Sequence, residues 1–452
     1  MEQPTREELL AWDRWHVWHG FTQMAEYEPL ILVEGQGCRV RDLEGRWYLD
    51  GVASLWCNVH GHRHPVLDAA LRAQLERVAH VTNLGASNVP AIQLARRLAQ
   101  LAPPGLEHVF FSDDGSTAVE VALKMAFQYW QQRPDPRPEK KRFLALAEAY
   151  HGDTLGSVSV GGVELFHAKF RPLLFECFRA PAPDTYRTPP GVPQEHLTTY
   201  YLQQVENILQ AHHHEIAAMI VEPLVQCAAG ILVHPPGFLQ GLRELTRKYQ
   251  VLLIADEVAV GFGRTGRMFA CQQEDVQPDF LCLAKGLTGG YLPMAATLTT
   301  TEIWNAFLGR YEDNRTFFHG HTYGGNPLAA AVALANLDLF DKEHLLESLP
   351  PKIDRLRQHL ERIGQLEHVG HVRQCGLIAG IELVRDRAAK EPYPRSERRG
   401  WRVCLQARTE GVLLRPLGDV VVIFPPLAIS LEELDLLCGA IERSIVAICK
   451  ER

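Results

Sequence analysis

Short apolar runs that alternate with amphipathic helical patterns are the feature that most restricts the fold of this chain. Such runs, four or five residues long and nearly continuous, suit strands that are buried on both faces of a mostly parallel sheet. A helical pattern lies between the first two runs, where Val119, Ala122 and Ala126 fall on one face. The pattern predicts an α/β sheet domain from about residue 65 to residue 325. The runs cover residues 108–111, 143–146, 217–221, 251–255 and 280–284.

The two ends of the chain follow a different pattern. The chain has 452 residues, more than one compact core usually holds, so two domains are expected. A long helical segment is predicted over residues 328–340, with strands over 376–383 and 420–424. Residues 1–64 contain short strand-and-turn patterns. We therefore predict a large domain over residues 65–325 and a smaller α+β domain built from residues 1–64 and 326–452.

Composition argues against several classes of function. The net charge of −8 and the lack of a basic run disfavour nucleic-acid binding. No stretch approaches the roughly 20 consecutive apolar residues of a membrane helix, and the first residues are too polar and acidic for a secretory signal. Ten scattered cysteines with no C-x-x-C pair indicate reduced thiols and a cytoplasmic protein. The run His212–His214 is interpreted as a solvated helix end, and no metal site is expected.

Two residues point to pyridoxal 5'-phosphate (PLP) chemistry. Lys285 follows the last predicted sheet strand, and Asp256 lies directly after the run 251–255. A lysine amine can form a Schiff base with the aldehyde of this cofactor. A carboxylate at a strand end can keep the pyridine nitrogen protonated, so that the ring accepts electrons. A lone lysine near a strand end is usually just solvated, so the interpretation depends on the other parts of such a site.

Those other parts occur in the order expected. Gly115 and Ser116 open a helix after a strand, where free N–H groups and hydroxyls can bind a phosphate, although a capped helix without a ligand is the plain alternative. Tyr150 lies after another strand and could stack on the ring or simply be buried. Glu222 could organise polar groups around the ring or cap a turn, and Val258 could pack on the ring face opposite Tyr150.

A glycine-rich turn after Asp256 matches a dinucleotide-binding pattern without the surrounding elements that such a site needs. Residues 261–266 spell G-x-G-x-x-G, the dinucleotide-loop pattern. No helical pattern follows it directly and no βαβ unit surrounds it, so no dinucleotide site is predicted there.

The motifs together resemble the class III aminotransferases, PLP-dependent enzymes of fold type I. The resemblance covers residues 15–440, and it is strongest with the branch of that family that works in biotin biosynthesis. It rests on the motifs at residues 58–62, 114–116, 124–130, 150–153, 261–266 with 269–271, and 319–327. It implies transfer of an amino group to 8-amino-7-oxononanoate, giving 7,8-diaminononanoate, with PLP as cofactor.

The resemblance also implies roles for particular positions. Lys285 would hold the cofactor covalently, Asp256 would pair with its ring nitrogen, and Tyr150 would stack on the ring. His321 and Thr322 would reach the phosphate of a neighbouring subunit, which makes the active unit a homodimer. The family usually has a proline where His321 stands.

Substrate positions follow from the same resemblance. Gly320 would lie against the substrate, and Arg415 would pair with the carboxylate of the oxononanoate, a task that suits the planar guanidinium. Without the resemblance, Arg415 would be interpreted as a surface residue.

The amino donor is where the chain departs from the best-known biotin aminotransferases, which use S-adenosylmethionine. Those enzymes carry a tyrosine, a tryptophan and a tyrosine where this chain has Phe21, Leu55 (before Trp56) and Val422. Loss of the tryptophan removes a stacking surface and a cation–π partner for a sulfonium donor. The residues at these three positions favour the branch of the family that uses L-lysine as donor. Three alternatives stay open: S-adenosylmethionine as donor, another class III transaminase for ω-amino acids or diamines, and a PLP-binding homologue without turnover.

Overall fold

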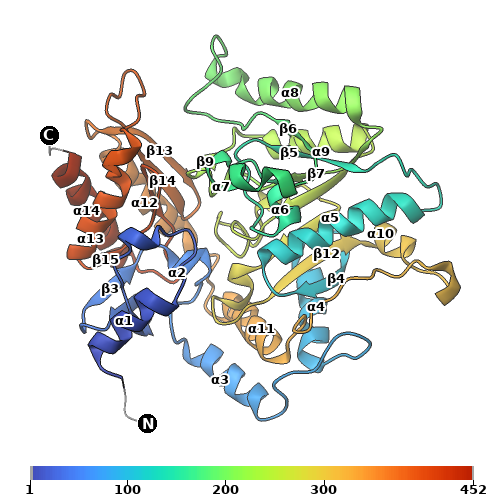
Figure 1. The fold of residues 1–452 in the computed structure, drawn as a ribbon, viewed down its shortest axis with the longest axis horizontal. Coiled ribbons are helices and arrows are strands. Elements are labelled where there is room, and N and C mark those ends of the chain that lie inside the picture. Colours follow the sequence, from blue (N-terminus) through green and yellow to red (C-terminus); the bar gives the residue numbers. More distant parts are fainter. Residues whose placement is uncertain (1–3, 450–452) are drawn as a thin grey trace.

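The computed structural model describes residues 4–449 (Figure 1). Its largest sheet has seven strands. The strand order is β4-β12-β11-β10-β7-β5-β6. All neighbours pair in parallel except those of β12, which runs antiparallel to both β11 and β4. The strands are β4 (Leu106–Ser112), β5 (Arg142–Leu146), β6 (Cys177–Ala180), β7 (Ile216–Val221), β10 (Leu252–Asp256), β11 (Phe280–Leu283) and β12 (Ala295–Thr300).

Helices cover both faces of this sheet, which explains why its strands are apolar at every position. Alternate side chains of one strand point to opposite faces, so Leu253 joins the core under α4, α8 and α9, whereas Ile254 joins the core under α5. Both cores consist of buried apolar side chains, as expected for a parallel sheet between helices. The helices of this region are α4 (Val89–Leu101), α5 (Gly115–Gln132), α6 (Leu155–Val160), α7 (Glu164–His167), α8 (Leu197–His212), α9 (Phe238–Lys248) and α10 (Thr301–Ala306).

Both chain ends meet beside the large sheet, where the blue and red segments lie together in Figure 1. One four-stranded sheet joins them, because β3 pairs in parallel with β15 through Leu49 and Val412. This sheet contains β1 (Leu32–Gln36), β2 (Arg39–Asp42), β3 (Trp47–Asp50) and β15 (Val412–Leu413). A second sheet contains β13 (Val369–Cys375), β14 (Ile378–Leu383), β17 (Val420–Ile423) and β16 (Pro416–Leu417). The helices here are α1 (Arg6–His16), α12 (Leu349–Ile363), α13 (Arg399–Thr409) and α14 (Leu431–Cys449).

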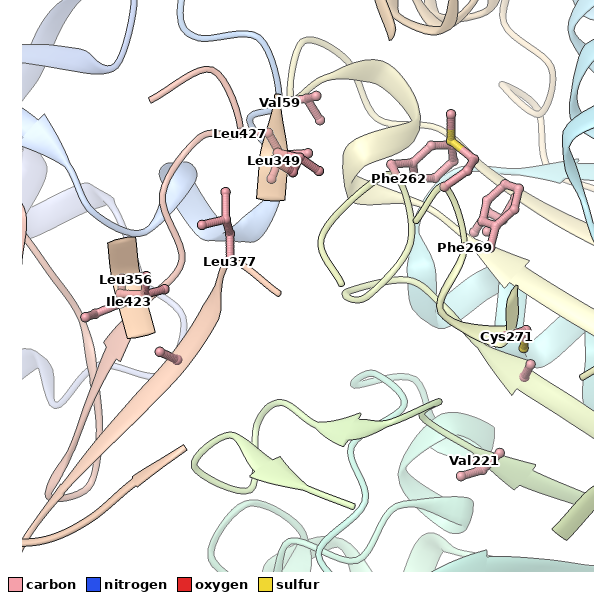
Figure 2. Close-up of a cluster of buried hydrophobic side chains, with 14 of the residues drawn as sticks. Val59, Val221, Phe262, Phe269, Cys271, Leu349, Leu356, Leu377, Ile423 and Leu427 are labelled. Atoms are coloured by element: carbon pink, nitrogen blue, oxygen red, sulfur yellow. The ribbon is translucent and has the colours of Figure 1, made fainter. Parts of the chain in front are cut away.

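A few elements connect the two regions. The four-residue turn α2 (Ala53–Trp56) leads towards the large sheet, and α3 (Pro65–Leu75) packs on α11 (Pro327–Lys342). A short hairpin pairs β8 (Val225–Gln226) with β9 (Leu232–Val233). Buried apolar side chains form one cluster that runs from the large sheet to the C-terminal elements (Figure 2), with Val221 and Phe262 at one side and Leu377 and Ile423 at the other.

A buried arginine reinforces this junction. Arg264 is 1% exposed, and its guanidinium donates to the carbonyl of Asn58 at 2.6 Å and to that of Pro425. It also lies 4.6 Å from the ring centroid of Phe424. One side chain from the loop after β10 therefore holds the N-terminal and C-terminal segments against the large sheet.

The predicted fold class is confirmed: a mostly parallel central sheet with a smaller α+β region made from both chain ends. The strand predictions were right within two residues, and the predicted domain limits at residues 64 and 325 stay predictions. β6 and β12 were not predicted. His212 ends α8, and its ring contacts Glu215 at 2.9 Å. No helix within residues 4–449 is both long and apolar enough to cross a membrane.

Candidate active site

A cavity of about 520 Å³ opens where five strands of the large sheet end. The carboxyl ends of β4, β5, β7, β10 and β11 all lie at this edge, because β4 and β11 are each antiparallel to the intervening β12. This is the edge at which open α/β sheets bind ligands. Most of the predicted site residues form its walls: Phe21, Leu55, Trp56, Gly115, Ser116, Tyr150, Glu222, Asp256, Val258, Lys285 and Arg415.

Three predicted residues lie outside these walls. Gly320, His321 and Thr322 belong to the loop before α11, and His321 contacts Asp113 of its own chain, Nδ1 to Oδ2, at 3.0 Å. The prediction that this loop completes the site of a neighbouring subunit stays a prediction.

Lys285 extends into the cavity from the end of β11. Its backbone has a φ of 44°, a left-handed conformation that is costly for a residue with a side chain. The amine lies 5.1 Å from the ring centroid of Trp56, and Trp56 in turn stacks on Phe424 at 5.2 Å. Strain held in place by surrounding packing is typical of functional positions. The lysine is thus aimed at the cavity with an aromatic wall beside it.

Asp256 is buried at the end of β10 and is held from two sides. The N–H of Val258 donates to its Oδ1 at 3.0 Å, and His151 Nδ1 lies 2.7 Å from its Oδ2. These contacts fix the carboxylate in one orientation at the base of the cavity. Sequence reasoning gave His151 no role, although its place beside Tyr150 after a strand end was a usable signal.

Tyr150 and Glu222 form the wall next to Asp256. The hydroxyl of Tyr150 donates to Asp153 Oδ2 at 2.6 Å, and burial together with Asp153 raises the pKa of the phenol, which therefore stays neutral. Glu222 accepts N–H groups from Tyr150 at 3.1 Å and Cys227 at 2.9 Å, and burial raises its pKa to about 7. Its carboxyl group thus orders the backbone of this wall.

The first turn of α5 forms an anion cradle. Asp114 caps the helix by accepting the N–H of Thr117 at 2.9 Å. The N–H groups of Gly115 and Ser116 belong to the part of a helix that lacks intrahelical acceptors, and the helix dipole favours an anion there. A Cβ at Gly115 would lie 2.5 Å from Val258 Cγ1, so only glycine allows this close approach. A phosphate group fits this cradle.

Arg415 provides a cation elsewhere in the same cavity. Its guanidinium lies 6.0 Å from the ring centroid of Phe21, and partial burial lowers its pKa from the usual value. In the described part of the chain it has neither a hydrogen bond nor an ion pair. A cation without a counterion in a cavity wall is suited to hold a carboxylate of a ligand.

The residues therefore fit PLP by their own chemistry. The cradle of α5 would hold the phosphate, Asp256 the ring nitrogen, and Lys285 the aldehyde carbon. Tyr150 and Val258 stand in the same walls and would flank the ring. Within residues 4–449, no three His, Cys, Asp or Glu side chains are grouped as metal ligands.

A neighbouring buried acid makes stability depend on pH. Glu257 accepts the N–H groups of Ala270 and Cys271, and burial raises its pKa to about 7 from 4.5. The folded protein keeps this proton where the unfolded chain loses it, so the free energy of unfolding falls as the pH rises from 4.5 to 7. The total loss is about 3 kcal/mol.

Urea unfolding of the parent and of Glu257→Gln at pH 5 and pH 8 measures this effect. Between these two pH values the free energy of unfolding should fall further in the parent than in Glu257→Gln. The difference between the two falls should be most of that amount. Equal losses in the two proteins would show that Glu257 ionises normally in the folded state.

Comparisons with known proteins agree with this geometry. The family profile described as aminotransferase class-III matches residues 22–445. A relative from Geobacter sulfurreducens, named adenosylmethionine-8-amino-7-oxononanoate aminotransferase, is 56% identical over 97% of both chains. The crystal structure of the protein of that name from Methanocaldococcus jannaschii is similar at a TM-score of 0.93 and 42% identity, covering 98% of this chain and 100% of that one. An amine transaminase from an uncultivated Pseudomonas species, solved in its PLP-bound form, is similar at a TM-score of 0.91 and 36% identity, covering 96% of this chain and 99% of that one.

A family match over 424 of the 452 residues (445 − 22 + 1) coincides with a cavity whose walls carry a lysine, a buried aspartate and a phosphate cradle. The chain belongs to the class III aminotransferases and is a PLP-dependent aminotransferase.

Proposed function

We propose that this protein converts 8-amino-7-oxononanoate to 7,8-diaminononanoate, a step of biotin biosynthesis. The observation that carries the proposal is Arg415, an unpaired cation in the wall of the same cavity as Lys285. An amino-oxo fatty acid presents a ketone to the reacting lysine and a carboxylate to such an arginine. The names of the relatives described above support the same substrate.

The residues divide the chemistry among them. When bound, PLP supplies an aldehyde that takes up amines and a ring that accepts electrons. Asp256 keeps the proton on the ring nitrogen, and His151 fixes the orientation of that carboxylate. Lys285 removes and returns a proton at the substrate carbon, acting first as base and then as acid. The neutral Tyr150 and the apolar Val258 keep water from the reacting atoms.

We propose L-lysine as the amino donor. Phe21, Leu55 and Val422 all line the cavity, and none carries a hydroxyl group or an indole ring. A sulfonium donor would lose the stacking and cation–π contacts that a tryptophan at position 55 gives. The names of the relatives point instead to S-adenosylmethionine, which is the second candidate donor.

Purified PLP-loaded protein, 8-amino-7-oxononanoate and one donor at a time will test both proposals. Product with L-lysine alone supports the donor proposal. Product with S-adenosylmethionine alone keeps the proposed reaction and rejects lysine. No product with either donor, while a simple amine still gives turnover, would return the chain to the broader transaminases of this family.

Substitution of Arg415 tests the substrate contact separately. Because charge-assisted hydrogen bonds to a carboxylate contribute about 1.5–3 kcal/mol, Arg415→Ala should raise KM for 8-amino-7-oxononanoate roughly 10- to 100-fold. The rate of the half-reaction with a simple amine that has no carboxylate should change little, since such a donor makes no ion pair with Arg415. An unchanged KM would place the carboxylate elsewhere.

We also propose that the active unit is a homodimer in the cytoplasm. Large aromatic side chains are strongly exposed on the single chain, including Trp15, Trp18 and Phe318, as expected for a surface that a second copy covers. Phe318 adjoins Gly320, His321 and Thr322, the loop predicted to reach the second site. The ten free thiols support a reducing compartment. Light scattering of the purified protein would test the dimer.

A further inference from the structure

A second cavity, of about 240 Å³, lies at the other end of the helix that carries the phosphate cradle. α5 has 18 residues, so its two ends are about 27 Å apart. The cavity is bordered by the C-terminal end of α5, the last turns of α9 and the start of β10. Four arginines line it, and we refer to it as the arginine cavity: Arg133, Arg137, Arg243 and Arg247.

Its charge is not balanced by its own carboxylates. Asp279 is occupied by a bidentate pair with Arg243 at 2.7 and 3.0 Å, and by the N–H of Leu253 at 2.7 Å. Glu302 accepts the hydroxyl of Tyr129. Arg137 pairs with Asp135 at 3.2 Å. Four arginines against three carboxylates leave a surplus of one positive charge, and Lys140 beside the cavity adds a second, in a protein whose formal net charge is −8.

Two of the arginines have no carboxylate partner. In the part of the chain that the structure describes, Arg133 and Arg247 make no ion pair with any carboxylate. Arg133 contacts only aromatic faces, at 5.1 Å from the ring centroid of Trp130 and 5.2 Å from that of Tyr129.

Lys140 places a second cation against the indole ring of Trp130. The amine of Lys140 lies 4.7 Å from the ring centroid of Trp130, and the residue is 1% exposed. It donates to the carbonyl of Ile216 at 3.0 Å rather than to a carboxylate. Burial, with repulsion from Arg137 and Arg133, lowers the pKa of Lys140 to about 8. Positive charge is therefore concentrated here at a cost to Lys140.

The cavity also contains donors that lack acceptors. The Nε atoms of Arg133 and Arg243 are both buried, and neither has a hydrogen-bond partner among the described residues. Buried guanidinium N–H groups without acceptors are costly and call for an explanation. A ligand with several oxygens would satisfy both.

The ends of α5 and α9 explain part of this clustering, because cations are favoured at helix C-termini. Each helix end contributes only about half a negative charge, so the two ends offset about one of the two surplus charges. The remaining positive charge is not accounted for by the fold.

We propose that the arginine cavity binds a phosphate-type oxyanion, which is inorganic phosphate, pyrophosphate or the phosphate group of a small ester. A phosphate dianion matches the surplus of two charges and offers oxygens in several directions, whereas a carboxylate offers one charge and one plane. Arginine forks bind phosphate oxygens in pairs. The site is separate from the cofactor cradle and does not depend on the donor or substrate proposed above.

Calorimetric titration of the PLP-saturated protein with phosphate, pyrophosphate and glycerol 3-phosphate will test this. The exposed Arg247 and the partly buried Arg133 are each changed to glutamine. Arg357→Gln is the matched control, since it removes the same charge from an exposed pair with Asp354. Each cavity variant should weaken binding about tenfold or more, and the control should not.

The three probes distinguish the sources of the ligand. Similar affinities for phosphate and pyrophosphate identify a free oxyanion, and about tenfold tighter binding of glycerol 3-phosphate identifies an ester. Absence of binding at millimolar concentrations would overturn the proposal. So would binding that is unchanged by Arg247→Gln and Arg133→Gln, which would place the probe elsewhere, for example in the cofactor cradle.

Discussion

Lys285→Ala should lower transamination roughly 10⁴-fold or more and remove the visible absorbance of the cofactor–lysine adduct. The variant loses the covalent anchor of the cofactor and the group that moves the proton, and acid–base catalysis alone contributes about 10²–10⁴-fold. Lys285 reaches the cavity through a strained backbone at the end of β11, which a neighbouring lysine cannot imitate. Steady-state rates and the absorbance spectrum of the PLP-loaded variant measure both effects.

Lys169→Ala serves as the control, because Lys169 is an exposed lysine outside the cavity wall. It should keep both the spectrum and the rate. Borohydride reduction of the parent followed by peptide mass analysis should place the cofactor on Lys285. Adduct absorbance that persists in Lys285→Ala would assign the covalent anchor to another lysine.

Asp256→Ala should lower kcat by roughly 10²–10³-fold, the usual cost of removing one preorganised electrostatic contact from an active site. Without the carboxylate, the ring nitrogen loses the charge that keeps it protonated, and the ring accepts electrons poorly. The loss should appear in single-turnover rates with either substrate, since both half-reactions use the same ring.

Asp256→Asn separates charge from shape. Asparagine can still accept the N–H of Val258, the contact now at 3.0 Å, but it brings no negative charge. Asp256→Asn should have a kcat nearly as low as that of Asp256→Ala. It should fold like the parent, with an unchanged unfolding midpoint. Activity near that of the parent in Asp256→Asn would show that the charge of Asp256 is not required.

Much of the site could be predicted because it follows strand ends. Asp256, Lys285 and Glu222 each come directly after an apolar run, and Tyr150 follows another run by four residues. Parallel strands bring their carboxyl ends to one edge of the sheet. The helix that begins at Gly115 was predicted for the same reason, since glycine and hydroxyl residues between a strand and an amphipathic pattern mark a helix start.

The remainder depends on contacts between distant parts of the chain. The carboxyl group of Asp256 is oriented by His151, 105 residues earlier, and no local sequence pattern predicts that contact. Arg415 sits in a short, irregular segment, so only the family resemblance gave it a role. β12 was missed because Ala295, Thr297 and Thr299 lack the apolar pattern of a buried strand, although all three are buried between helices.

The pairing of β3 with β15 has a consequence for synthesis and folding. Leu49 leaves the ribosome 363 residues before its partner Val412 (412 − 49), so the N-terminal strands emerge long before their sheet can be completed. The interval includes the whole large sheet, which can fold first and act as the template on which the chain ends later meet. Pairing at such sequence separation is slow, and incomplete chains expose unpaired strand edges that favour aggregation. A nascent chain stalled before residue 412 would thus be a natural substrate for chaperones.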